Sequence, residues 1–243
     1  MSDARTSPRP AHRLLSAVRE VALIVIGVLI ALGADSAWQY RQDRLEEKEI
    51  LQSIRSEMLG DTLQLQWRIL MHRGIDATVE RILSEWEASG SPVTIPDSVL
   101  IQLFRRPTFQ PTLSALEASL ASGRFNLIQN PRLREALAGW PRDVADAAED
   151  EIQGRALFEA QVLPRLFENT NAVPIQILHA VSNQNQDPDS WVWPGSETEI
   201  HVDQEIANHL ARRRFFGMEG YKDLELLRAR LLTIVAMIDR EAQ

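Results

Sequence analysis

The residues of this chain that could do chemistry are its histidines and its acidic side chains, because it contains no cysteine. His201, Asp203, Glu205 and His209 lie closest together, and the last two, four residues apart, would share one face of a helix. Imidazole and carboxylate groups can bind zinc. Their spacing matches no His-Glu-x-x-His or comparable motif, so we expect a solvated helix start here and no cofactor.

Two groups of carboxylates are candidates for acid–base work: Glu149, Asp150 and Glu151, and Asp143 with Asp146. Such groups act as acids and bases only in a cleft that shifts their pKa values. On an amphipathic helix they usually form a solvated face, which we expect here. The sequence also has no glycine-rich phosphate loop, no Gly-x-Ser-x-Gly elbow and no Cys–His pair. We therefore predict a protein that is not an enzyme.

A basic run next to two aromatic residues, Arg212, Arg213 and Arg214 followed by Phe215 and Phe216, could contact lipid headgroups or an acidic partner. The alternative that we favour places both phenylalanines in the core and the arginines at the surface.

A second aromatic group, Trp191 and Trp193, lies in a region rich in Asn, Gln, Asp and Pro, residues 169–195. Exposed tryptophans are typical of binding hot spots, although tryptophans in loops more often hold the loop against the core. These two residues and the three arginines of residues 212–214 form our candidate partner patch.

The most apolar stretch is Val21–Ala34, about 14 uncharged residues where a membrane-spanning helix needs about 20. Its flanks lengthen it, because Arg19 can hold its guanidinium among the headgroups, and Trp38 and Tyr40 suit the opposite interface. We predict a membrane anchor over residues 13–40. A cleaved signal peptide and a buried core helix of a soluble protein remain the alternatives.

The charges around this stretch predict its orientation. Four arginines precede it and three basic residues follow it, a small bias when only Lys and Arg are counted. We therefore expect a disordered cytoplasmic tail over residues 1–12 and a periplasmic C-terminal domain in the bacterial inner membrane. The net charge is −8, which argues against a nucleic-acid partner. Gly27 and Ala31, four residues apart, would let two anchor helices approach closely, so a homodimer through the anchor and stalk is a further expectation.

The chain after the anchor predicts an all-α fold. An amphipathic stalk helix over residues 41–89 should continue the anchor without a break, with apolar residues at helical spacing that Asp61 and His72 interrupt. We expect an irregular helical bundle over residues 97–243, packed against the stalk. Asn130 and Pro131 mark a helix start, Ser114 opens a capping box, and helical structure should resume at residue 196.

Two segments resemble a bacterial family of single-pass membrane proteins that is known only as a domain of unknown function. The first runs from EVALIVIGVLIAL through Trp38 to EEKEILQSIRSEM, and the second is LEASLASGRFNLIQNPRLREAL, residues 116–137. The resemblance covers the N-terminal third well, the middle moderately and the C-terminal third weakly. Residues 33–37 depart from the family's more polar pattern. The resemblance implies an anchor and a helical extracytoplasmic domain, and no activity.

The function that we predict from these features is a membrane-anchored, non-enzymatic interaction or sensing module with an unidentified protein partner. The alternative is a membrane-tethered periplasmic hydrolase whose carboxylates or histidines converge only in three dimensions.

Overall fold

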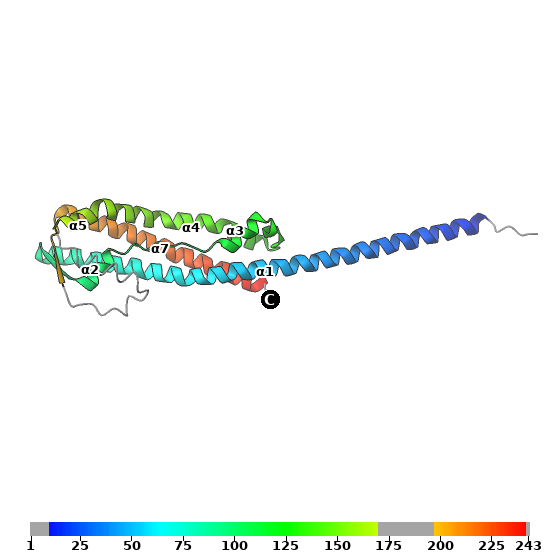
Figure 1. Ribbon diagram of the computed structural model, residues 1–243, viewed down its shortest axis with the longest axis horizontal. Helices are drawn as coiled ribbons and strands as arrows, with labels where there is room; N and C mark the ends of the chain where they lie inside the picture. Colours follow the sequence, from blue (N-terminus) through cyan, green and yellow to red (C-terminus); the bar gives the residue numbers. More distant parts are fainter. Residues whose placement is uncertain (1–9, 170–196, 242–243) are drawn as a thin grey trace, which may run out of the picture.

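The computed structural model describes residues 10–169 and 197–241, with side chains for residues 19–168 and 197–241, and it confirms the all-α class. Three long helices dominate: α1 (Pro10–Ser89), α4 (Pro131–Leu157) and α7 (Gln204–Glu241). Figure 1 shows α4 and α7 packed beside the C-terminal half of α1, while the N-terminal half projects alone. The shorter elements are β1 (Val93–Pro96), α2 (Asp97–Leu103), α3 (Ser114–Ala121), η1 (Arg124–Leu127), η2 (Phe158–Val162), α5 (Leu163–Asn169) and β2 (Glu197–Ile200).

Helix α1 is continuous over the predicted anchor and stalk, 80 residues in all. After Pro10 the next proline is Pro92, so every interior residue can donate its backbone N–H. The helix ends at Ser89, as predicted, because Gly90 takes a φ of +77°, a conformation that favours glycine.

Helix α4 begins as the sequence predicts. The Oδ1 of Asn130 accepts the backbone N–H of Arg132 at 3.0 Å and that of Leu133 at 3.2 Å, and Pro131 occupies the first turn. Pro141 lies inside α4, which continues to Leu157. The helical path then passes through η2, a single π-helical stretch, into α5.

The expectation of helix at residues 196–199 is wrong, because residues 197–200 form β2. The sequence also predicted no strand, whereas β1 and β2 are both present. They pair antiparallel, with Val93 opposite Ile200. At four residues each they are too short to show a clear alternation of apolar and polar residues. Helix α7 starts later, where Asp203 Oδ1 accepts the N–H of Ile206 at 2.8 Å. The bundle domain was predicted to start at residue 97. The sheet crosses that boundary, because β1 precedes residue 97 and β2 lies within the predicted domain.

The predicted capping box at Ser114 is also wrong. Helix α3 does begin there, but its N-cap is Leu113, and no side chain caps it. The hydroxyl of Ser114 donates instead to Glu57 of α1 at 2.5 Å.

The bundle has two apolar cores, one above the other along α1. The proximal core, nearer the projecting half of α1, includes Leu65 of α1, Trp140 of α4 and Leu231 of α7. The distal core, at the far end of the bundle, includes Ile82 of α1 and Phe158 of η2, together with both strands. Between the two lies a group of buried polar side chains, which we call the polar layer.

Candidate functional site

The polar layer consists of His72 on α1, Glu151 on α4 and Arg213 on α7, all three buried. The Nε2 of His72 lies 2.9 Å from Oε1 of Glu151. The second oxygen of Glu151, Oε2, accepts the backbone N–H of Phe109 at 3.2 Å. At this level of the bundle each of the three long helices therefore contributes one buried ionisable group. The two carboxylate oxygens of Glu151 have different partners.

The two Nη atoms of Arg213 donate to backbone carbonyl groups. Its Nη1 donates to the carbonyl of Gly154 at 3.3 Å, and its Nη2 donates to those of Leu103 at 3.1 Å and Arg105 at 3.2 Å. The guanidinium also lies 3.9 Å from the centre of the Phe158 ring, a cation–π contact. Burial lowers the pKa of Arg213 to about 10, so the group stays charged at neutral pH and can donate to all three carbonyl groups.

An extended segment, residues 104–113, crosses the bundle from α2 to α3 along α1 (Figure 1), and we call it the crossing segment. Pro107 and Pro111 disfavour helix here and carry no backbone N–H. The segment's other N–H groups need partners that regular structure does not supply.

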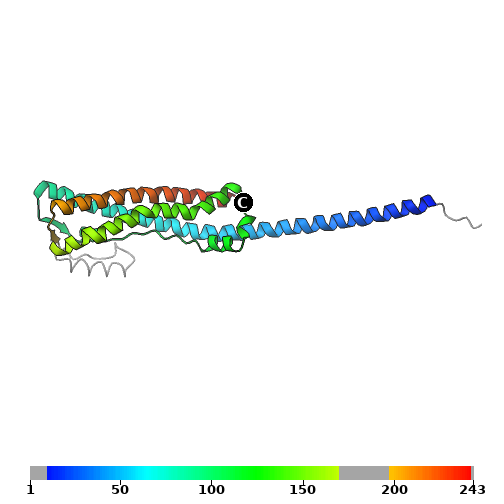
Figure 2. The same cartoon turned by 90° about the horizontal axis from the view of Figure 1, so that it is seen from above.

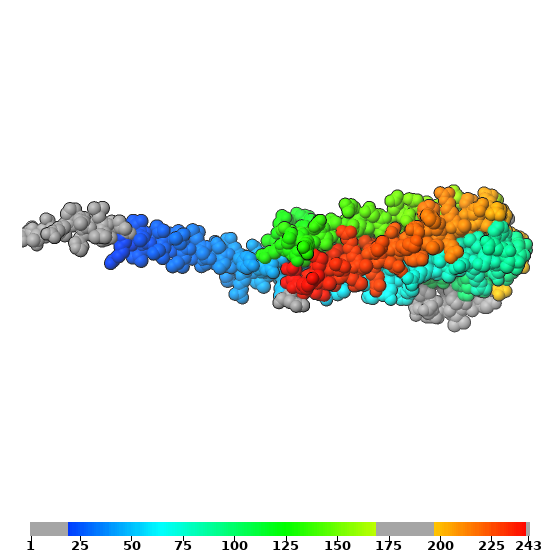
Figure 3. Space-filling model, turned by 180° about the vertical axis from the view of Figure 1, so that it is seen from behind, coloured from blue at the N-terminus to red at the C-terminus, as the bar shows by residue number. Residues whose placement is uncertain are grey.

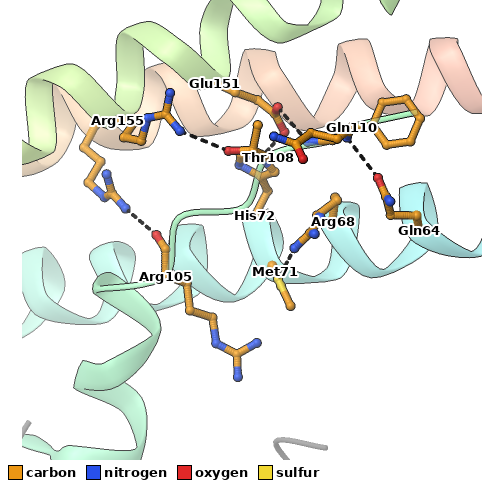
Figure 4. Close-up of polar contacts among 11 residues, drawn as sticks. Gln64, Arg68, Met71, His72, Arg105, Thr108, Gln110, Glu151 and Arg155 are labelled. Carbon is orange, nitrogen blue, oxygen red and sulfur yellow. Dashed lines mark hydrogen bonds and ion pairs between the residues drawn. The ribbon is translucent and has the colours of Figure 1, made fainter. Parts of the chain in front are cut away.

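A row of acceptors on α1 supplies those partners. Gln64 accepts the N–H of Gln110 at 2.9 Å, and the two oxygens of Asp61 accept that of Thr112 at 3.0 and 3.1 Å. One turn earlier on α1, both carboxylate oxygens of Glu57 accept the N–H of Ala115, each at 3.0 Å. Figure 4 shows Gln64, His72 and Glu151 converging on the crossing segment from α1 and α4. The two polar residues that interrupt the apolar pattern of α1 thus have partners in the interior. Asp61 accepts the N–H of Thr112 in the crossing segment, and His72 contacts Glu151.

Small residues let α4 and α7 approach each other at the polar layer. A Cβ added at Gly154 would lie 3.2 Å from Cβ of Phe216, and one added at Gly220 would lie 3.8 Å from the side chains of Asp150 and Glu151. The first distance is tighter than ordinary contact. Glycine at position 154 therefore brings α7 close enough for Arg213 to reach the carbonyl groups beneath it.

The cavity beside the polar layer is small. It is lined by residues that include His72, Glu151, Arg155 and Arg213, and the space open to the centre of a water molecule is about 30 Å³. That volume holds one or two water molecules, whereas pockets for small-molecule ligands measure roughly 300–1,000 Å³. The ionisable groups that meet here can bind each other and the backbone, but the cavity leaves no room for a substrate.

The carboxylates of α4 divide between surface and interior, which corrects the expectation of a solvated face. Glu149 is exposed, as expected, but Glu151 is buried against His72. Asp143 is largely covered and pairs with Arg230 at 2.7 Å. The sequence contains one indication of this, since Glu151 falls on the same helix face as the buried Ala147 and Gly154.

The basic–aromatic run is also divided. Arg213 is buried, which contradicts the expectation of three surface arginines, whereas Arg212 is exposed and Arg214 pairs with Asp76 at 2.7 Å. The expectation that both phenylalanines are core residues is wrong as well, since Phe215 is exposed. The helical period of 3.6 residues explains this result, because consecutive residues of α7 cannot all face the same way. The other two members of the candidate partner patch, Trp191 and Trp193, lie outside the described residues.

The histidine and acidic group at the start of α7 is solvated, and Arg165 of α5 pairs with Glu205 there. His209 lies 3.7 Å from Glu205. Within residues 10–169 and 197–241 no three ligand-type side chains are grouped so as to hold a metal ion.

The predicted anchor residues lie on the projecting half of α1. An 18-residue window here has a mean hydropathy of 2.2, none of it is buried, and the stretch is long enough to cross a membrane. Gly27, Ala31, Trp38 and Tyr40 are all exposed, as is Arg19 at the start. This exposure contradicts the alternative of a buried core helix. Figure 3 shows the half as a single rod of side chains leaving the bundle.

We compared the chain with known proteins at the level of sequence family, curated sequence and solved structure. No protein-family model, no curated protein and no solved structure matches it.

Proposed function

We propose that this protein is a single-pass membrane protein whose helical domain acts outside the cytoplasm as a non-enzymatic interaction or sensing module. One observation carries the proposal: the apolar stretch of α1 is wholly exposed, yet it continues without a break into the helix that forms one wall of the bundle. An exposed stretch of this length and hydropathy is stable in a bilayer and costly in water.

The orientation that we propose has the N-terminus in the cytoplasm and the bundle in the periplasm. The four arginines that precede the apolar stretch support it through the positive-inside rule. Trp38 and Tyr40 then mark the outer interface. In this arrangement α1 holds the bundle above the membrane, with its long axis continuing that of the anchor (Figure 2).

The contacts of the polar layer support a structural role for its ionisable groups over a catalytic one. Its histidine and carboxylate do converge in three dimensions, which is the arrangement that the hydrolase alternative requires. Glu151, however, already holds both His72 and the backbone of Phe109, and the adjoining cavity admits only water. We therefore assign these groups to holding the crossing segment.

Reporter fusions test the topology. Alkaline phosphatase fused to the C-terminus should be active, because the enzyme folds only outside the cytoplasm, and a fluorescent protein that folds only in the cytoplasm should be dark at the same position. The opposite pair of results would overturn the proposal.

A second measurement separates an anchor from a cleaved signal peptide. The mature protein should keep its full mass of 27.5 kDa and stay in the membrane after carbonate extraction. A product that has lost the apolar stretch and is released in soluble form would show that the stretch is a signal peptide.

A further inference from the structure

The outer side of α1 carries a second row of apolar side chains that the bundle leaves uncovered. The row, which we call the outer stripe, consists of Leu59, Leu63, Trp67 and Leu70, with exposed fractions of 39, 65, 52 and 49%. At about 100° per residue these four positions fall within an arc of about 80°. Leu65, which fills the proximal core, lies about 160° from Leu63. Figure 1 shows α4 and α7 on one side of α1, and the outer stripe faces away from the core that they form.

The stripe is too far from the bilayer to be covered by lipid. Leu59 follows Tyr40 by 19 positions and Leu70 by 30, which places the stripe roughly 28–45 Å of helix beyond the membrane exit. Exposed rows of large apolar residues in water mark interaction surfaces. The occupant must therefore be protein.

We propose that the outer stripe is covered by the same stripe of a second copy of this chain, in a parallel dimer; this rests on the membrane anchoring proposed above. Two anchored copies are held in the same orientation, so their α1 helices run parallel and equivalent residues meet about a two-fold axis. On a regular helix Gly27, Ala31, Trp38 and Leu45 fall in the same arc, so the contact continues into the bilayer, where small residues let helices approach.

The charges on this face allow a copy to meet itself. Between Leu59 and Leu70 the remaining positions on the same face are Gly60 and Gln66, and none of them is charged. In a two-fold contact any charged residue near the axis would face its own copy and repel it. Closer to the membrane the face carries Gln52 and Ser56, which are uncharged as well. The charged residues Arg41 and Glu49 fall at the two edges of the arc, about 40° on either side of its centre, and so lie off the axis.

Single-cysteine crosslinking tests the dimer, and the absence of native cysteine makes each result unambiguous. Leu63→Cys and Leu70→Cys, oxidised in isolated membranes, should each give a disulfide-linked dimer as the main species. Leu226→Cys is the matched control, because this leucine is 69% exposed but borders the groove between α4 and α7. We expect less than a tenth as much dimer from it.

Two outcomes would overturn the dimer. One is equal crosslinking at positions 63 and 226, which would indicate random collision. The other is a monomeric Leu63→Cys protein that reacts with maleimide either as fast as Leu226→Cys, indicating an open stripe, or much more slowly, indicating cover by another segment or protein. Because the reporter fusions measure anchoring separately, active phosphatase fusions without crosslinking would remove the dimer and leave the proposed function intact.

A polar substitution gives independent support. Leu63→Gln combined with Leu70→Gln should shift the detergent-solubilised full chain from the mass of a dimer to that of a monomer in light scattering. Leu226→Gln should leave the mass unchanged. A wild-type chain that is already monomeric in membranes and in detergent would overturn the proposal.

Discussion

The proximal core and the polar layer are built from the same three helices in opposite ways. In the proximal core α1, α4 and α7 meet through apolar side chains such as Leu65, Trp140 and Leu231. Two turns further along α1 the same helices meet through His72, Glu151 and Arg213. The difference is the crossing segment, whose backbone passes between the helices and brings N–H and carbonyl groups that apolar side chains cannot satisfy.

This comparison teaches where buried charge is useful in a small helical bundle. A buried ion pair on its own is weak evidence for stability. Here Glu151 and Arg213 also bind backbone: Glu151 accepts the N–H of Phe109, and Arg213 donates to the carbonyl groups of Leu103 at the end of α2 and of Gly154 in α4. The polar layer therefore holds an irregular segment in place through hydrogen bonds to its backbone, whereas the proximal core stabilises the bundle by burying apolar surface. Side-chain truncations in the two regions should therefore destabilise the protein for different reasons.

The largest effect should come from the proximal core. Trp140 is fully buried, so Trp140→Ala should lower the free energy of unfolding by about 3–5 kcal/mol, through lost apolar contact and a cavity. Trp140→Phe should cost much less, because the indole Nε1 has no hydrogen-bond partner among the described residues. Urea denaturation of the full chain in detergent measures both. A cost below about 1 kcal/mol for the alanine variant would contradict this packing.

The next largest effect should come from the polar layer. Glu151→Ala leaves His72 and the N–H of Phe109 buried without a partner, and we expect a loss of about 3 kcal/mol. Hydrogen exchange at the Phe109 amide should accelerate in the variant, an effect that a core truncation would not localise there. Glu149→Ala, two residues away and exposed, is the matched control. Equal costs for the two variants would remove the distinction between polar layer and surface.

A smaller, pH-dependent effect should appear at Asp61, which holds Thr112 in the crossing segment. Burial raises the pKa of Asp61 above its ordinary value of 3.8, outweighing the hydrogen bonds from Thr112 that lower it. Its contribution to stability is therefore full below the unfolded pKa and is lost as the pH rises through the folded pKa. Asp61→Asn keeps an acceptor for Thr112 and should change stability at pH 7 by less than about 1 kcal/mol.

The pH dependence of the free energy of unfolding distinguishes the wild type from Asp61→Asn. Because asparagine does not titrate, Asp61→Asn should become more stable relative to wild type between pH 4 and pH 7, in unfolding measured at both values. A difference that is the same at both pH values would show that Asp61 has no raised pKa.

The smallest effect should be at Leu63, which belongs to neither region. Leu63→Gln should change the free energy of unfolding of a monomer by no more than about 0.5 kcal/mol, because the side chain is exposed. Leu65→Ala, two residues along the same helix but in the proximal core, should cost about 2–5 kcal/mol. Thermal unfolding of both in detergent, below the concentration at which copies associate, measures the contrast. Similar costs would mean that the two faces of α1 are not distinct.

Local rules in the sequence predicted much of the fold. The end of α1 at Ser89, the cap at Asn130 and the all-α class each depend on a few adjacent residues. The strands were missed because β1 and β2 are short and pair across more than 100 positions. The polar layer was missed because a carboxylate in a charged run looks the same whether its helix turns it to water or to the interior. His72 and Asp61 did appear as interruptions in an apolar pattern, but their partners come from distant segments.

Composition and helical periodicity along α1 were sufficient to indicate an apolar stretch able to cross a membrane and a long helix that continues it. These properties arise from neighbouring residues, so no knowledge of the rest of the chain is needed. Only the tertiary structure decided which of the polar residues are buried. It also decided that Glu151 and Arg213 hold the crossing segment. Burial of a polar group depends on which backbone atoms are brought against it, and those atoms lie 42 positions away for Glu151 and as many as 110 for Arg213.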